Sequence, residues 1–518
     1  MKKYIPWLLL ASLLMIAARY TGNVFTSLRI STNGIVSEPV TATTEDITLY
    51  VRTTGADTND GLTVGTALRQ PQEAADRIPK HVEHNVTVDV GEGNFTGFFM
   101  RGFVFSADTV TLIKGTLGNP TLTTGTTSGT ADGGSNIQLV DSTQNWTDHE
   151  LRGRLILVDG EYRVARDNDT TTIDTVGTYS ASVSGKAYEI LEQKTVLNAD
   201  GPCATSSKIM VKSCMGVRDS LNIQDFKTTG GTIGIGAWDT SGHTWTRLWV
   251  SGAYYGGLQQ TTRGTSIIAD CFFDSATGQG LTCAEVQGQI RIWNVYAYNS
   301  TGTGIFGGGA VSVSSTTTYL CADNNGGIGI ELYSFNEFFA DAVLAKNNTK
   351  SGLSITDAGL IVIGKVDIEN NVENGIELYN TAMSLSTSGS IISGNTLWGI
   401  VINKEVSNVS SYVSSGGTLN LGSAAAIIES NGSGGIKSQY NGVVKLGDTT
   451  GINTGAHGLV LETGSIAQVT STTAITGATG DSTINGGTTD LTWATDFAAD
   501  GDMVINLDNA CRIERKDP

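Results

Sequence analysis

A turn of the form Asn, a few residues, Gly, then Ile or Leu recurs along half of this chain at nearly constant spacing. Its clearest copy runs from Asn370 to Ile376. When the aliphatic residue after the glycine is taken as a marker, successive markers lie 23, 23, 24, 23, 25, 23, 24, 36 and 23 residues apart. The markers are Ile235, Leu258, Leu281, Ile305, Ile328, Leu353, Ile376, Ile400, Ile436 and Leu459. A fixed period of this length is typical of a solenoid built from one repeated unit.

Each repeat contains short stretches in which apolar and polar residues alternate, as in Ile376-Glu377-Leu378-Tyr379. The marker and the residue two positions later therefore share one face of a strand, which is expected to be the core face. Two further apolar stretches follow in each period, for example residues 360–363 and 366–368. Three strands in about 23 residues leave no room for the helix of a βαβ unit, so each strand must pair with its equivalent one turn later. The sequence therefore predicts an all-β, right-handed parallel β-helix of about ten rungs, with three strands per rung.

Asparagines mark the corners of several repeats. An asparagine tolerates the left-handed backbone of a tight corner, and asparagines on successive rungs can hydrogen-bond up the stack. We expect such a ladder at Asn348, Asn371, Asn395 and Asn431. The one long interval, 36 residues, contains a Ser- and Gly-rich stretch at 407–417, where an outward loop is expected.

The pattern divides the chain into five segments. Residues 1–22 have a cationic start and an apolar run at 7–18, which predicts either a signal peptide or an apolar anchor helix that docks into a membrane or a virion. Residues 23–124 are expected to form an N-terminal cap with a short helix near 72–78, followed by the first rungs. Residues 125–193 lose the period and predict a small inserted antiparallel β domain. Residues 194–476 are expected to form the β-helix, and 477–518 a C-terminal cap or an oligomerisation segment.

Composition removes several classes of function. The formal net charge is -18 and no basic run occurs, which argues against a nucleic-acid binder. No phosphate loop, dinucleotide fingerprint, nucleophile elbow or HExxH motif is present. The six cysteines have no CxxC spacing, so neither a metal site nor another cofactor is expected. Cys203 and Cys214 are one candidate disulfide pair, and the other cysteines are expected to be buried thiols.

The repeat pattern from Ile235 to Thr476 resembles that of the pectin-lyase-like superfamily of right-handed parallel β-helices, which includes phage tailspikes and secreted polysaccharide lyases and hydrolases. The resemblance implies a protein that is secreted, or displayed on a cell or virion surface, with a polysaccharide as its partner. The likeness to tailspikes implies a homotrimer. The glycines around His457 resemble those around a histidine of polygalacturonases, but the aspartate pair and the Arg-Lys motif of that family are missing, so no role is transferred to His457.

Carboxylates are the candidate catalytic groups. Glu331, Asp357 and Glu377 are expected at outward positions on consecutive rungs, about 5 Å apart per rung. Two carboxylates separated by roughly 5 to 9.5 Å can act as acid and base, or as acid and nucleophile, on a glycosidic bond. The alternative is that these residues only make a solvated sheet more soluble.

Aromatic residues gather in the first rungs and are the candidate ligand-binding groups. They are expected to form a stacking platform for sugar rings, unless they fill a wider core at that end. The platform residues are Trp238, Trp245, Trp249, Tyr254, Tyr255 and Trp293. Two functions remain open from sequence. One is an extracellular or virion-surface protein that recognises a surface polysaccharide, with or without cleaving it. The other is a non-catalytic structural or adhesive spike of a phage particle or a cell surface.

Overall fold

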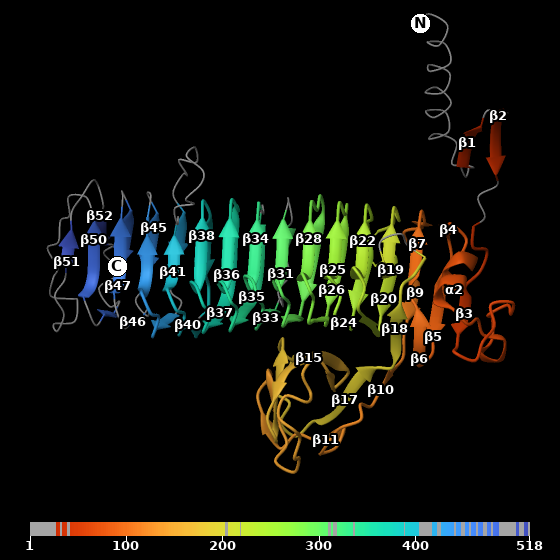
Figure 1. Ribbon diagram of the computed structural model, residues 1–518, viewed down its shortest axis with the longest axis horizontal. Coiled ribbons are helices and arrows are strands. Elements are labelled where there is room, and N and C mark those ends of the chain that lie inside the picture. The colour runs from red at the N-terminus through yellow and green to blue at the C-terminus, as the bar shows by residue number, and fades with distance from the viewer. Residues whose placement is uncertain are drawn as a thin grey trace, which may run out of the picture.

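The fold is a long parallel β-helix that carries one side domain (Figure 1). The computed structural model describes residues 27–31, 34–38, 42–202, 206–217, 219–308, 312–313, 319–334, 337–387, 389–402, 417–421, 426–439 and 442–446, and further short strands after residue 446. Fourteen parallel strands of one sheet follow each other along the axis. They are β7 (Phe98–Arg101), β19 (Ser207–Lys212), β22 (Ile233–Trp238), β25 (Tyr255–Gln260), β28 (Gln279–Ala284), β31 (Ile305–Gly308), β34 (Ile330–Tyr333), β36 (Leu353–Thr356), β38 (Ile376–Tyr379), β41 (Trp398–Ile402), β44 (Gly434–Ser438), β47 (His457–Glu462), β50 (Gly480–Asn485) and β51 (Val504–Asn506).

The predicted fold class is confirmed, and the stack is longer than the ten rungs that the markers predicted. Two strands, β7 and β19, precede the first marker, and two strands, β50 and β51, follow the last one. The Asn-Gly-Ile turn is absent from the sequence of these outer rungs, so the repeat pattern could not reveal them. Their strands nevertheless pair in register with their neighbours.

The marker residues form an inward column of the 14-stranded sheet at eight rungs out of ten. The exceptions are Leu258 and Ile328, whose places in the column are taken by Gly257 and Ile330. Because side chains alternate between faces, a displacement of one residue sends Leu258 outward. Gly257 fits the inward position because the ring of Phe273 fills the space that a side chain would need.

The other two sides of the helix form a single 26-stranded sheet. The sheet is continuous because two long strands turn the corner without a break, namely β35 (Glu337–Lys346) and β37 (Leu360–Glu369). Strand β35 pairs with both β32 (Ser312–Val313) and β33 (Tyr319–Asp323) of the preceding rung. The inward residues of all three sides belong to one continuous hydrophobic core.

The predicted asparagine ladder is present. The Nδ2 amide of each ladder residue donates to the Oδ1 of the next at 2.9 Å, through Asn348, Asn371, Asn395 and Asn431, and Asn325 adds one step before them. These side chains are buried. The left-handed backbone belongs instead to the preceding residue, such as Asn347 (φ 57°) and Asn370 (φ 56°). The ladder and the left-handed corner, which we expected from a single asparagine, are therefore provided by two adjacent residues.

The N-terminal end is capped as predicted by a short helix, α2 (Pro71–Arg77), with Pro at its first position. Its buried Ala74 and Ala75 join the solenoid core, so the helix covers the apolar opening. Strands β3 (Ile47–Val51) and β5 (Val86–Val90) pair in parallel beside it and continue into the 26-stranded sheet.

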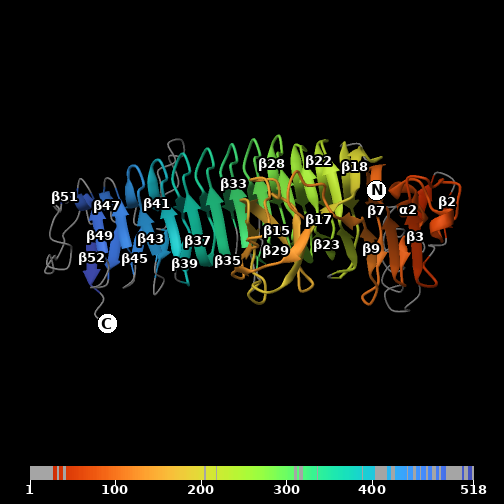
Figure 2. The same cartoon turned by 90° about the horizontal axis from the view of Figure 1, so that it is seen from below.

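The predicted antiparallel β domain, here called the insert, projects from one side of the solenoid (Figure 1), and in the view from below it lies in front of the solenoid strands (Figure 2). Its strands are β10 (Leu117–Gly118), β11 (Ser128–Thr130), β12 (Gly133–Gly134), β13 (Gln138–Val140), β14 (Leu155–Val158), β15 (Glu161–Asn168), β16 (Thr172–Val176) and β17 (Ala187–Gln193). The insert has its own core, which includes Trp146 and Tyr188. A separate apolar cluster joins Leu155 and Val176 of the insert to Phe272 and Tyr296 of the solenoid, so the insert is packed against one side of the helix.

Several sequence predictions concern residues outside the described ones. These are the apolar run at 7–18, Cys203, the outward loop at 407–416 and most of 477–518. Cys214 is described as a buried thiol, and burial raises its pKa to about 11. Among the described residues, no helix has the length and apolar character needed to cross a membrane.

Candidate functional site

An open groove runs along the corner that leads into the 14-stranded sheet. It has a volume of about 450 Å³. The residues of its wall and floor come from four successive rungs and from the turn that precedes β36, and they include Tyr254, Tyr255, Gln279, Thr303, Glu331 and Lys350. Three of these were singled out by the sequence analysis, namely Tyr254, Tyr255 and Glu331.

A column of glycines creates this groove. Gly278, Gly302 and Gly327 stack at the corner and are joined by backbone hydrogen bonds. Gly302 N donates to Gly278 O at 2.7 Å, and Gly327 N donates to Gly302 O at 3.0 Å. Tyr254 precedes them in the same column and Lys350 follows, through the bonds Gly278 N to Tyr254 O and Lys350 N to Gly327 O. The three glycines have no side chains of their own, and apart from the ring of Tyr254 over Gly278 the corner is open as far as the ammonium group of Lys350. At one rung spacing per step, these ends are roughly 19 Å apart along the axis.

The aromatic end of the groove is a pair of tyrosines. Tyr254 is 49% exposed, and its ring meets that of Tyr255 edge-on, with centroids 4.8 Å apart. A Cβ at position 278 would meet both the carbonyl oxygen and the ring of Tyr254. Gly278 therefore allows the ring to lie over the corner, where Tyr254 remains about half exposed.

Glu331 lies in the wall of the groove. Burial raises the pKa of its carboxyl group, and the charge of Glu377 acts in the same direction. The hydroxyl of Thr303, which donates to Glu331 Oε2 at 3.2 Å, and the ammonium of Lys350 oppose this rise. The result is a half-buried acid with an elevated pKa, a group that can donate a hydrogen bond or a proton to a bound molecule.

Glu377 shares a column with Glu331, two rungs further along. Glu331 pairs with Ser354, and Ser354 pairs with Glu377. The carboxylate of Glu377 is only 5% exposed and accepts hydrogen bonds from Ser351 Oγ (2.8 Å), Asn374 Nδ2 (2.6 Å) and Tyr379 OH (3.2 Å). These donors hold the group in place within the wall of the solenoid.

Asp357 does not lie in the column of Glu331 and Glu377, where consecutive rungs had been expected. It occupies the corner after β36, in the left-handed conformation (φ 50°), and accepts a hydrogen bond from Asn380 Nδ2 at 2.9 Å. The residue at the predicted strand position on that rung is Ser354. The reason is that the strand ends before position 357, so the alternation of faces no longer applies there.

The six predicted aromatic residues do not meet at one place. Only Tyr254 and Tyr255 lie in the groove. Trp245 occupies an inward position and is fully buried in the core, where its ring contacts that of His243 in a tilted arrangement, with centroids 5.5 Å apart. Trp249 belongs to the cluster beneath the insert, with the cations of Arg154 and Lys227 over its ring. Trp238 and Trp293 end their strands on two different sheets, β22 and β29 (Gln289–Trp293).

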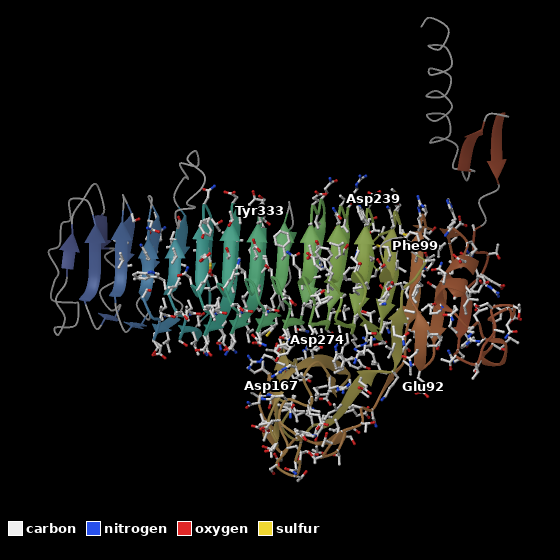
Figure 3. All side chains as sticks on the ribbon, in the orientation of Figure 1. Glu92, Phe99, Asp167, Asp239, Asp274 and Tyr333 are labelled. Atoms are coloured by element: carbon white, nitrogen blue, oxygen red, sulfur yellow. The ribbon has the colours of Figure 1, made fainter. Side chains whose placement is uncertain are left out.

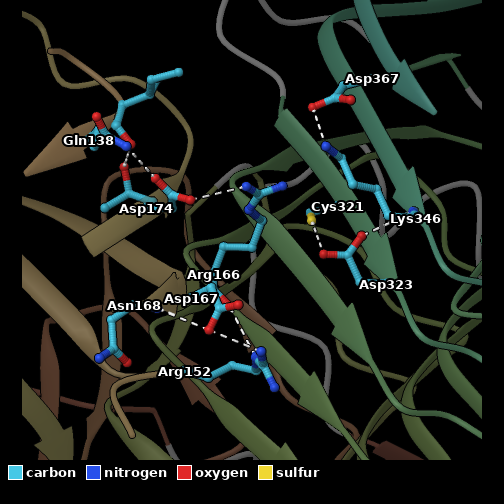
Figure 4. Close-up of polar contacts among 12 residues, drawn as sticks. Gln138, Arg152, Arg166, Asp167, Asn168, Asp174, Cys321, Asp323, Lys346 and Asp367 are labelled. Carbon is cyan, nitrogen blue, oxygen red and sulfur yellow. Dashed lines mark hydrogen bonds and ion pairs between the residues drawn. The ribbon is translucent and has the colours of Figure 1, made fainter. Parts of the chain in front are cut away.

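A second hollow, the cleft, lies between the insert and the solenoid and was not foreseen from sequence. Its volume is about 730 Å³. Arg166 of the insert reaches toward the solenoid here, as Figure 4 shows, and donates to Asp174 at 3.3 Å. Burial alone would lower the pKa of the Arg166 guanidinium. The negative charges of Asp323 and Asp174 have the larger effect, so the pKa is raised. No signal in the sequence places the residues of the two cleft walls together, because the insert and the rungs that it faces are about 150 residues apart along the chain.

The strand order and register define the class of this protein as a parallel β-helix. No protein-family model matches the chain. No curated protein matches it either.

Solved structures provide three comparisons. The A-module of a mannuronan C-5 epimerase from Azotobacter vinelandii is 11% identical, with a TM-score of 0.36, covering 83% of this chain and 91% of that one. The GH136 lacto-N-biosidase of Eubacterium ramulus is 11% identical, with a TM-score of 0.29, covering 91% and 67%. The gp54 tailspike of Acinetobacter baumannii bacteriophage AP22, solved with a capsular saccharide, is 11% identical, with a TM-score of 0.22, covering 79% and 73%.

Proposed function

We propose that this chain is a surface or secreted protein that recognises a polysaccharide in the groove at the corner of the 14-stranded sheet. The single observation that carries the proposal is the column of three glycines between Tyr254 and Lys350, where the corner has no side chains of its own. An extended, open channel along the axis suits a linear polymer better than a small compact ligand. The ring of Tyr254 offers an apolar face for a sugar, and Glu331 and Lys350 offer hydrogen-bonding groups to its hydroxyls.

Recognition without cleavage is the form of this function that the geometry favours. In its usual mechanisms, hydrolysis of a glycosidic bond uses two carboxyl groups that both reach the substrate. Glu331 faces the groove, but the carboxylate of Glu377 is buried and occupied by three donors. The expected behaviour is therefore binding of a polysaccharide whose length does not change.

The test uses the full chain and a panel of bacterial surface polysaccharides, with retention on the immobilised glycan and release of reducing ends both measured. We expect retention without new reducing ends. Tyr254→Ala should weaken binding about fivefold, corresponding to the loss of about 1 kcal/mol of stacking. The matched control is Tyr333→Ala, because Tyr333 is 48% exposed on the same sheet but lies at the end of β34, outside the groove (Figure 3). Equal effects of the two substitutions, or no binding to any glycan, would overturn the proposal.

The alternative function is a structural or adhesive spike without a glycan site, and failure of every polysaccharide in the panel would favour it. If binding is accompanied by new reducing ends, the recognition is catalytic. In that case Glu331→Gln should abolish chain shortening and leave retention in place, because the amide keeps its shape but cannot donate a proton. Light scattering of the purified chain tests the homotrimer that we propose for the assembled protein.

A further inference from the structure

The cleft between the insert and the solenoid has the dimensions of a ligand site. Its volume of about 730 Å³ lies within the range of roughly 300 to 1,000 Å³ that is usual for small-molecule pockets. Strands β15 and β16 of the insert form one wall, and strands β33, β35 and β37 of the solenoid form the other. The insert is anchored through the preceding rungs, where Phe272 and Tyr296 contact it, and it extends past them over β35 and β37.

The solenoid wall of the cleft is apolar and partly aromatic. Phe339 and Val362 occupy one outward column on successive rungs, and both are half-buried. Tyr319 borders them and is half-buried as well. Surfaces of this kind receive the C–H face of a sugar ring. On the insert side the cleft is lined by Ile137, Arg166, Asp174, Thr175, Val176 and Gly177.

Polar groups around this wall have unused hydrogen-bonding capacity. Asp367 accepts from Lys346 Nζ through Oδ2 at 2.8 Å, but its other oxygen, Oδ1, is buried and has no donor among the described residues. Lys365, two residues earlier on the same strand, is half-buried, and its ammonium group forms no hydrogen bond or ion pair with any described residue. A buried acceptor without a donor is rare in folded proteins and indicates a missing partner. An unused acceptor and an unused cation beside apolar rings suit a ligand that both donates and accepts hydrogen bonds.

We propose that the cleft is a second saccharide site, distinct from the groove, that holds a short neutral oligosaccharide between the insert and the solenoid. Sugar hydroxyls both donate and accept, so they can accept from Lys365 and, after a rotation of the Asp367 carboxylate that turns Oδ1 toward the cleft, donate to that oxygen. Acidic sugars are disfavoured because carboxylates outnumber cations in the lining, with Asp174, Asp341 and Asp367 against Arg166 and Lys365. The insert thereby acquires a role, since it supplies one wall of the site.

The test measures binding of neutral trisaccharides to the full chain by calorimetry, with probes built from glucose, galactose, mannose, rhamnose and N-acetylglucosamine and with trigalacturonate as an acidic probe. We expect at least one neutral trisaccharide to bind. Val362→Trp should weaken that binding at least about tenfold by filling the cleft. Ser384→Trp is the matched control, because Ser384 is the next residue of the same outward column and does not line the cleft. The urea midpoints of both variants verify that they fold.

A second variant tests the polar contribution. Lys365→Met should weaken trisaccharide binding severalfold without lowering the urea midpoint, because the ammonium has no partner to lose in the described part of the chain. Lys445→Met, an exposed outward lysine far along the solenoid, is its control. Binding of no neutral probe, binding of trigalacturonate alone, or equal losses in Val362→Trp and Ser384→Trp would overturn the inference. Loss of trisaccharide binding in Tyr254→Ala would assign it to the groove and overturn the second site, whereas polysaccharide retention reports on the groove independently.

Discussion

Glu331 and Glu377 occupy equivalent outward positions of the 14-stranded sheet, with Ser354 on the rung between them. Their surroundings nevertheless differ. Glu331 faces the groove and accepts one hydrogen bond, at 3.2 Å, from Thr303. Glu377 is buried and accepts three. One residue type in one column therefore has two roles, a ligand-facing acid at the first position and a structural acceptor at the second.

This difference predicts opposite sensitivities to truncation. Glu377→Ala should lower the free energy of unfolding by about 2 to 3 kcal/mol, because it leaves the donors of Ser351, Asn374 and Tyr379 without their acceptor. Glu331→Ala should cost less than about 1 kcal/mol, since it removes one long hydrogen bond from a half-buried site. Urea denaturation followed by circular dichroism measures both. Equal losses would show that the two carboxylates are not in different environments.

The period of the sequence predicted most of the core and could not predict all of its register. An inward position in a stack accepts few side chains other than aliphatic ones, so eight markers were assigned correctly from their spacing. The position of Gly257 depends on Phe273, which lies on another side of the helix and fills the column from there. A pattern confined to one strand cannot contain that information.

The ladder of asparagines predicts a second contrast, between two neighbouring residues. The side chain of Asn371 takes part in four hydrogen bonds, with Asn348 Nδ2, the backbone N of Asn348, Asn395 Oδ1 and the carbonyl of Ala345. Asn371→Ala should therefore lower the free energy of unfolding by about 3 to 5 kcal/mol. Asn370→Gly should be nearly neutral, because Asn370 is exposed with φ 56° and glycine adopts this backbone readily. Thermal unfolding of both variants measures the contrast, and a large loss in Asn370→Gly would contradict this division of roles.

The groove was half predictable. Tyr254, Tyr255 and Glu331 were recognised by residue type, but the hollow that joins them depends on which turn residues stack. Gly278, Gly302 and Gly327 precede three successive strands, and in the sequence they look like the glycines of the other turns. Only the hydrogen-bond register places them in one column with Tyr254 and Lys350. The sequence left open whether the aromatic residues bind sugars or fill the core. The burial of Trp245 and the partial burial of Trp249 depend on strand parity and on the packing of the insert, so the pattern could not decide between the two.

Asp270 predicts a pH dependence of stability. Burial raises its pKa to about 6, although Asn294, Arg163 and Arg247 act in the opposite direction. Because the native state then binds this proton more tightly than the unfolded chain, the contribution of Asp270 is fully present below pH 4 and is lost as the pH rises from about 4 to about 6. Asp270→Asn should therefore raise the Tm at pH 7 and leave it nearly unchanged at pH 4.

The control for this prediction is Asp357→Asn. Both aspartates have the left-handed backbone, with φ 51° and 50°, and both accept a hydrogen bond at 2.9 Å from an asparagine one rung later. They differ in burial and in their charged neighbours. Asp357 is exposed, whereas burial raises the pKa of Asp270, and the charged groups Arg163, Arg247 and Glu161 lie near it. The Tm of Asp357→Asn should shift little at either pH. A gain in Tm at pH 7 that is equal in both variants would show that burial is not its cause.

The contact between the insert and the solenoid predicts a contrast between two glycines of the insert. Gly153 and Gly160 both have a left-handed backbone, with φ 80° and 84°. A Cβ at position 153 would overlap the ring of Phe272, whereas a Cβ at position 160 would meet nothing within 4 Å. Gly160→Ala should therefore cost only the backbone strain, about 1 kcal/mol. Gly153→Ala should in addition separate the insert from β27 (Phe272–Asp274), and faster hydrogen exchange in peptides that contain this strand measures the separation. Because the insert supplies one wall of the cleft, trisaccharide binding should weaken in Gly153→Ala and not in Gly160→Ala. Equal hydrogen exchange in the two variants would mean that Phe272 does not hold the insert in place.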